Sequence, residues 1–137
     1  MKYVDIYCIG VSDASHIGAW VALLRYKNKE KVIRGELENT NAIRATMIAI
    51  IKGLESLKEP CNVTVYTQVD FIPKVFELGW RRKSNLDLWR RIDELDEIHS
   101  VQYKWYTKIA TVFKAAEKAP YLRSSIFPEQ HYHPSRP

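Results

Sequence analysis

The sequence predicts an α/β domain built around a mixed five-stranded sheet, and three observations lead to this prediction. The chain opens with three consecutive segments rich in β-branched and aromatic residues. Apolar residues then recur at helical spacing, and helical and extended segments alternate up to residue 119. At 137 residues, the chain has room for one domain with a core of its own.

The first half of the chain predicts an antiparallel meander that leads into a helix. Strands are expected over residues 3–9, 18–26 and 31–38. From Asn41 onward, apolar residues recur at steps of three and four, which is the pattern of an amphipathic helix. Thr40 or Asn41 can cap the start of this helix, and Pro60 ends it.

The second half predicts crossover connections and a short final helix. Helices are expected over residues 70–78, 85–98 and 111–119, and strands over residues 63–67 and 101–106. The order is therefore β-β-β-α-β-α-α-β-α, which gives a mixed sheet flanked by helices. Residues 120–137 contain Pro, Ser and His without periodicity, so we expect a loosely ordered tail after a domain of residues 1–119.

Composition and charge indicate a basic intracellular protein. The formal net charge is +5 and the pI is about 9.2, which suits a polyanionic partner without requiring one. Cys8 and Cys61 stand alone, as the reduced thiols of intracellular proteins do. We find no signal-peptide pattern and no apolar run of the roughly 20 residues that span a bilayer. We therefore expect a cytoplasmic protein that does not enter membranes.

Seven stretches of the chain share their local sequence and their order with one known family. They lie at residues 4–7, 18–24, 40–45, 50–57, 65–67 and 85–92, followed by the strand that carries Trp105. Together they resemble the type 1 ribonuclease H family. The resemblance implies a ribonuclease H-like fold over residues 1–119. It also implies an enzyme that cuts the RNA strand of RNA·DNA hybrids with two Mg²⁺ ions held by four acidic side chains.

The positions at which that family carries its metal-binding acids have other residues in this chain. By the resemblance, these positions are Ile9, Thr46, Gln68 and Ala116. Isoleucine, threonine and alanine are poor Mg²⁺ ligands, and glutamine offers a single neutral oxygen. We therefore predict that the domain is catalytically inactive, is not an enzyme, and holds no metal ion or other cofactor.

Other acidic residues offer an alternative metal site. Asp13 follows the first strand, Asp70 follows the fourth, and Glu117 lies in the last helix, so all three could approach one edge of this fold. Such a relocated site would make the domain a metal-dependent nuclease. The simpler interpretation is a turn residue, a helix cap and a solvated helix residue. His131 and His133 are interpreted as tail residues rather than metal ligands.

A basic cluster with an interleaved aromatic residue is the clearest sign of a ligand. Its candidate residues are Trp80, Arg81, Arg82, Lys83, Arg90, Arg91 and, on the last strand, Lys104. Cationic side chains bind phosphate and an indole ring stacks on bases or sugars, so RNA, DNA or an RNA·DNA hybrid would fit here. The alternative is a solvated surface on which Arg90 pairs with Glu94, and Arg91 with Glu94 or Asp87, at helical spacing.

Three hypotheses of function remain open from the sequence, and the metal-dependent nuclease with relocated acids is the third of them. The leading one is an inactive module that binds nucleic acid or acts as a scaffold, a pseudoenzyme of its family. The alternative is a protein-interaction module, either a homodimer or a decoy subunit. Its support is the set of apolar side chains where a polar site would lie, at Ile9, Ile43 and Ile109.

Overall fold

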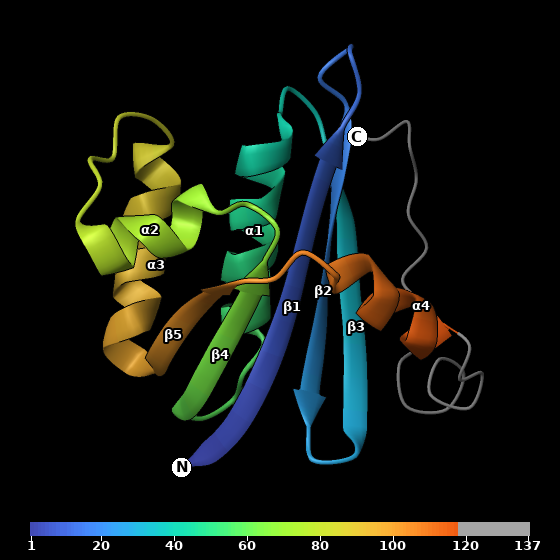
Figure 1. Cartoon of the computed structure of the whole chain (residues 1–137), viewed down its shortest axis with the longest axis vertical. Helices are drawn as coiled ribbons and strands as arrows, with labels where there is room; N and C mark the ends of the chain where they lie inside the picture. Colours follow the sequence, from blue (N-terminus) through green and yellow to red (C-terminus); the bar gives the residue numbers. More distant parts are fainter. Residues whose placement is uncertain (118–137) are drawn as a thin grey trace.

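The computed structural model describes residues 1–117, and within them the side chains as far as Lys114. The strands are β1 (Lys2–Ser12), β2 (Gly18–Tyr26), β3 (Lys29–Leu37), β4 (Cys61–Thr67) and β5 (Ser100–Trp105). The helices are α1 (Ala42–Glu55), α2 (Phe71–Leu78), α3 (Leu86–Ile98) and α4 (Ile109–Glu117). This order confirms the predicted β-β-β-α-β-α-α-β-α arrangement around a five-stranded sheet (Figure 1).

The sheet is mixed, as predicted, and β1 lies at its centre in the strand order β3-β2-β1-β4-β5. β1 pairs antiparallel with β2, which pairs antiparallel with β3, so the meander forms one side of the sheet. On the other side, β1 pairs parallel with β4, and β4 pairs parallel with β5. The parallel pairs need crossover connections, and α1 and the α2–α3 pair supply them.

Helices cover the two faces of the sheet unequally (Figure 1). α1, α2 and α3 pack on one face over a large apolar core that includes Ile6, Ile50 and Trp89. α4 crosses the opposite face, where Ile109 is buried against Tyr7 in a smaller cluster. Burial of each large apolar side chain stabilises the fold by about 1.5–3 kcal/mol, so the three-helix side carries most of the apolar stabilisation.

Helix α1 begins directly after the predicted cap Asn41 and ends at Glu55, before the predicted end at Pro60. The side chain of Asn41 accepts a hydrogen bond from the backbone N–H of Arg44 at 2.8 Å. At the other end, the Ser56 hydroxyl donates to the Gly53 carbonyl at 2.7 Å, and the Ser56 N–H donates to the carbonyls of Lys52 and Gly53. These bonds tighten the last turn and stop the helix at Glu55.

A glycine on β1 allows the sheet to approach α1 closely. A Cβ atom placed on Gly10 would lie 2.1 Å from the backbone N of Thr46 and 2.7 Å from the Cβ of Ala45. Any side chain there would push the helix off the strand, because such contacts are far inside van der Waals distance. The end of β1 and the second turn of α1 are thus in direct contact.

The tail predicted for residues 120–137, with His131 and His133, lies outside the described residues. Within residues 1–117, no helix is both long and apolar enough to cross a membrane.

Candidate nucleic-acid interface

Three of the four positions that the resemblance assigns to metal-binding acids lie together. The parallel pairing of β1 with β4 runs up to Cys8 and Thr67, so Ile9 and Gln68 come next, at the adjacent ends of the two ladders. Gly10, which follows Ile9, touches the backbone of Thr46 on α1. The fourth position, Ala116, lies in α4, in the part of that helix whose side chains are not described.

The side chains at these three positions differ in their surroundings. Thr46 is 2% exposed, and its hydroxyl donates to the Ala42 carbonyl at 2.8 Å. Ile9 is half-buried and packs against the small apolar cluster under α4. Gln68 is exposed, and its backbone carbonyl accepts a hydrogen bond from Nε1 of Trp105 at 3.1 Å. Thr46 and Ile9 therefore serve the packing of the fold.

These residues do not fit a pair of divalent metal ions. Among the described side chains, no group of three or more His, Cys, Asp or Glu could hold a metal ion. Asp13 accepts hydrogen bonds from the backbone N–H groups of Ser15 and Ile17 at 2.8 and 3.1 Å, as a turn residue. Asp70 makes no capping hydrogen bond and pairs with Lys74 at 3.4 Å. The side chain of Glu117 is outside the described set.

A hollow of about 470 Å³ lies beside these positions, between the start of α1 and the segment before α3. Its lining is made by Asn41, Ala42, Ile43, Met47, Phe71, Ser84, Asn85 and Trp89. The lining combines apolar and aromatic side chains with the amides of Asn41 and Asn85 and the hydroxyl of Ser84. α1 has no acidic residue in its own first turn, so its N-terminus keeps backbone N–H groups and a dipole that favour an anion. The hollow is therefore suited to an anionic ligand with a flat apolar part.

Arg44 ties the two sides of the hollow together. Its Nη1 donates to Asn85 Oδ1 and to Asp87 Oδ1, both at 3.1 Å, and its Nη2 donates to Asp87 Oδ2 at 2.7 Å. The hydrogen bonds from Arg44 lower the pKa of Asp87 to about 2. Asn85 occupies a left-handed backbone conformation with φ of 56°, which asparagine tolerates better than most residues. Sequence reasoning missed Arg44 and Asn85 as site residues because they lie 41 residues apart.

The structure divides the predicted basic cluster into paired and unpaired cations. Arg82 pairs with Asp93 at 2.6 Å, while Arg91 pairs with both Glu55 and Glu94 at 2.9 Å. The unpaired members are exposed and form no ion pair within the described part of the chain; they are Arg81, Lys83 and Arg90. The unpaired set is the part of the cluster that is free to bind phosphate.

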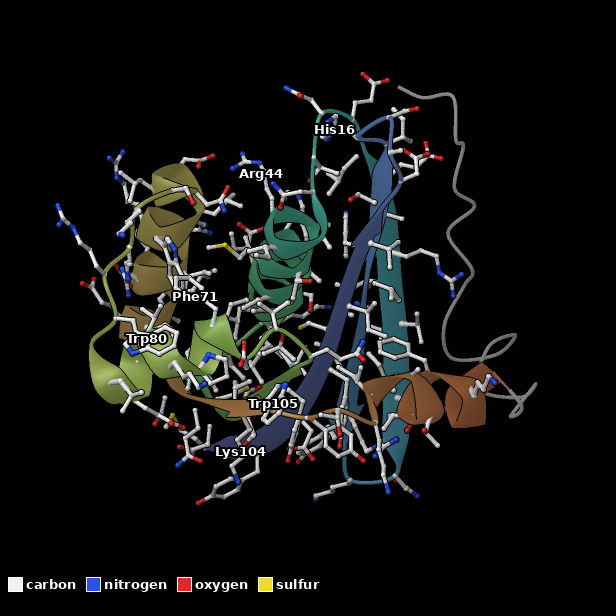
Figure 2. The ribbon with its side chains drawn as sticks, turned by 45° about the horizontal axis from the view of Figure 1, so that its top comes forward. His16, Arg44, Phe71, Trp80, Lys104 and Trp105 are labelled. Carbon is white, nitrogen blue, oxygen red and sulfur yellow. The ribbon has the colours of Figure 1, made fainter. Side chains whose placement is uncertain are left out.

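The aromatic candidate Trp80 stands next to the hollow. Trp80 is 43% exposed, and its ring centroid lies 5.9 Å from that of Phe71, which lines the hollow (Figure 2). The ammonium of Lys74 lies 5.1 Å from the Trp80 ring centroid. Phe71 of α2 and Trp80 of the segment after α2 therefore continue the hollow as an aromatic surface.

Lys104 lies away from the rest of the cluster. Its neighbour Tyr103 stacks on Phe76 of α2, with ring centroids 4.1 Å apart, so Tyr103 faces the helices. Successive side chains of a strand point to opposite faces, so Lys104 projects from the other face of the sheet. It does not add to the basic surface around Trp80, and Figure 2 shows the two side chains well apart.

No family model matches the chain. The ribonuclease H of Caldicellulosiruptor saccharolyticus is 38% identical to it, in a match that covers 76% of this chain and 82% of that protein. The chain belongs to the ribonuclease H family. Two further curated ribonucleases H are similar to this family member, at 34% identity from Legionella pneumophila strain Corby and 33% from Helicobacter acinonychis. These matches cover 74% and 77% of this chain and 81% and 80% of the relatives.

Solved structures agree with the ribonuclease H fold. The N-terminal RNase H domain of a Mycobacterium tuberculosis protein matches with a TM-score of 0.71 at 15% identity, covering 88% of this chain and 99% of that domain. LC11-RNase H1, solved in complex with an RNA/DNA hybrid, matches with a TM-score of 0.65 at 14% identity, covering 75% of this chain and 84% of that protein. Both the predicted family and the predicted fold are confirmed.

The relatives contradict one central prediction. The ribonuclease H-like chain was expected to be an inactive pseudoenzyme that binds nucleic acid or acts as a scaffold, with a protein-interaction module as the alternative. That expectation is wrong, because the curated proteins that match most of the chain at 33–38% identity are named as enzymes, which points to a nuclease. It relied on the residue types at Ile9, Thr46, Gln68 and Ala116, and their assignment to the family's acids stays a prediction.

Proposed function

We propose that this domain is a nuclease that acts on RNA·DNA hybrid. The observation that carries the proposal is the match of curated ribonucleases H over about three quarters of the chain. The hybrid bound to LC11-RNase H1, a structure of the same fold, supports the choice of ligand. The substrate is thus a mixed duplex with one RNA strand, and the reaction is hydrolysis of that strand.

The surface around the hollow supports this ligand on physical grounds. The backbone N–H groups at the start of α1 and the side-chain amides of Asn41 and Asn85 can donate to phosphate oxygens. The unpaired cations Arg81, Lys83 and Arg90 add charge without a competing carboxylate. Trp80 offers an exposed ring for contact with a sugar or base. Together these groups fit a sugar–phosphate backbone that lies across α1, α2 and the start of α3.

The described residues bear on substrate binding more than on the hydrolysis step. The family resemblance implies divalent metal ions, but Ile9, Thr46 and Gln68 do not fit such ions, and the described side chains include no group of three or more His, Cys, Asp or Glu that could hold one. The described residues supply binding and orientation of the duplex.

The proposal is tested by a combined binding and cleavage assay. End-labelled RNA·DNA hybrid, double-stranded RNA and each single strand are incubated with the protein in Mg²⁺, Mn²⁺ or chelator, over a series of salt concentrations. We expect the RNA strand of the hybrid to be cut and the other substrates to be cut slowly or not at all. Hybrid that is bound but never cut would reject the nuclease, and preference for another substrate would reject the hybrid.

A variant from the same chain controls for nuclease carried over from the expression host. The double variant Arg81→Glu, Lys83→Glu is purified in the same way and assayed at the same concentration. Both positions are exposed, so the variant should fold, and the reversed charges should weaken binding of any polyanion. Cleavage that persists unchanged in the variant belongs to a contaminant or to a different surface.

A further inference from the structure

In the connector between α2 and α3, residues 79–85, Arg82 packs against the helices while its two neighbours are exposed. The guanidinium carbon of Arg82 lies 4.5 Å from the ring centroid of Trp89 and 5.6 Å from that of Phe76. Its Nη1 lies 2.6 Å from Oδ2 of Asp93, and its side chain is 28% exposed. Arg82 therefore spans both helices, with its charge neutralised and its flat face covered.

The rings under Arg82 belong to the core. Trp89 is 2% exposed, and Phe76 stacks on Tyr103 of β5. These rings cannot move without disturbing the packing of α2 and α3 on the sheet. Arg82 is thus packed on a rigid part of the core, and this packing holds the middle of the connector in place.

The neighbours of Arg82 point outward. Arg81 and Lys83 are exposed and carry no ion pair within the described residues, and both belong to the unpaired cations of the proposed interface. Since Arg82 faces inward between them, the direction of its side chain sets the direction of theirs. A loose connector would spread these two cations over many positions and would have to be ordered on binding.

We propose that Arg82 is a positioning residue, which with Asp93 clamps the connector onto α2 and α3 and thereby holds Arg81 and Lys83 ready for the phosphates of a nucleic acid. This inference rests on the proposed function. Arg82 itself does not bind phosphate, since a phosphate would have to displace Asp93 from a charge-assisted hydrogen bond. We call Arg82, Asp93 and the two rings the connector clamp.

The connector clamp makes a prediction opposite to that of simple electrostatics. Asp93→Ala removes a negative charge near the interface, so charge alone would strengthen binding of a polyanion. The clamp predicts weaker binding of RNA·DNA hybrid, by about 3- to 10-fold, which corresponds to ordering one or two side chains on binding. Arg82→Lys keeps the charge but loses the flat stacking and the fork of donors, so it should weaken binding similarly.

The chain offers a matched control in the next residue of α3. Glu94→Ala removes the same charge from the next position in the sequence. Glu94 pairs with Arg91 rather than with Arg82, and Arg91 still has Glu55 as a partner in the variant. Hybrid affinity of this variant should equal or slightly exceed that of the unmodified protein. Binding by Asp93→Ala that is as tight as by Glu94→Ala would overturn the clamp.

A measurement without nucleic acid separates failure of the clamp from failure of the proposed function. Trypsin cleaves after Arg81 and Lys83, so the rate of nicking in the connector reports its mobility. Asp93→Ala should be nicked several-fold faster than Glu94→Ala, while both unfold at similar temperatures. Equal nicking rates would reject the clamp whatever the ligand is. Faster nicking together with no hybrid binding by the unmodified protein would reject only the proposed function.

Discussion

Arg44 connects the start of α1 to the start of α3 by a planar fork of hydrogen bonds to Asp87 and Asn85. This geometry suits a guanidinium and a carboxylate, because two parallel N–H···O bonds fix both groups at once. It also keeps the carbonyl oxygen of the Asn85 side chain occupied, which leaves the amide N–H groups for a ligand in the hollow. The ion pair of Arg44 and Asp87 thus sets the orientation of the Asn85 side chain.

The pKa of Asp87 tests this fork. The hydrogen bonds from Arg44 hold it at about 2, below the ordinary value of 3.8. Since the folded-state pKa is lowered, the pair contributes stability above about pH 4 that is lost as the pH falls toward 2. In Arg44→Ala, an NMR titration should place the pKa of Asp87 near its ordinary value. The difference in unfolding free energy between the two proteins should shrink over the same pH range. An unchanged pKa would mean that the fork does not form in solution.

Asp96 shows the opposite shift. It is about half-buried in α3 and accepts a hydrogen bond from the Tyr103 hydroxyl at 2.7 Å. Burial raises its pKa to about 6, with a smaller contribution from Asp93, while the hydrogen bond from Tyr103 and the charge of Arg82 act against the shift. The folded state therefore holds this proton more tightly than the unfolded state does.

The sign of the pH dependence follows from that difference. Asp96 should make the protein less stable as the pH rises from about 4 to about 6, and the loss persists above pH 6. Asp96→Asn keeps an acceptor for Tyr103 and should stabilise the protein at pH 7.5 by on the order of 1 kcal/mol, discounted for screening by solvent, with little gain at pH 4.5. Urea unfolding at the two pH values measures this. The exposed Glu97→Gln is the control, and lower stability of Asp96→Asn at pH 7.5 would contradict the prediction.

The individual elements show where local sequence suffices and where it does not. α1 follows its helical spacing and its Asn41 cap, and α2 ends at Gly79 as predicted, with φ of 68°. β1 runs on to Ser12, past the predicted end at residue 9, because Ser12 pairs with Gly18 of β2. Strand ends depend on what the partner strand offers, and a single segment does not carry that information.

The candidate site was predictable to a similar degree. The density of basic residues around Trp80 is visible in the sequence, but which of them stay unpaired is not. Arg82 is taken by Asp93 and Arg91 by Glu55 and Glu94, and only the Arg91–Glu94 pair follows from helical spacing. The hollow is formed by segments that are far apart in the chain, so nothing in the local sequence indicates it.

The contact between β1 and α1 gives a prediction about two glycines. Gly10→Ala should destabilise the protein by about 3 kcal/mol or more, because the new methyl group meets the backbone of α1 at 2.1 Å. Gly79→Ala should cost only about 1 kcal/mol, since its surroundings are open and only the left-handed backbone with φ of 68° resists it. Chemical denaturation of both variants compares the costs. Equal losses of unfolding free energy in the two variants would show that α1 can shift away from β1 at little cost.

At the scale of the whole molecule, the effect of net charge on nucleic-acid binding can be distinguished from the effect of where the charged side chains lie. The formal net charge of +5 would attract a polyanion from any side. Within the candidate cluster, however, Arg82 and Arg91 are paired inside the fold, while the unpaired Arg81 and Lys83 lie in the segment that reaches the hollow at Ser84 and Asn85. If the positions of the unpaired cations decide binding, the duplex binds to one face of the molecule. If only the net charge matters, no face is preferred.

Two substitutions that change the net charge equally decide between these views. Arg81→Ala and Arg91→Ala each remove one positive charge, but Arg91 is already balanced by Glu55 and Glu94. Loss of one phosphate contact should lower the slope of log K against log salt by about 0.9, so Arg81→Ala should bind hybrid more weakly with a shallower slope. Arg91→Ala should keep the slope of the unmodified protein. Equal slopes in both variants would mean that the duplex feels only the overall charge and that the interface lies elsewhere on the molecule.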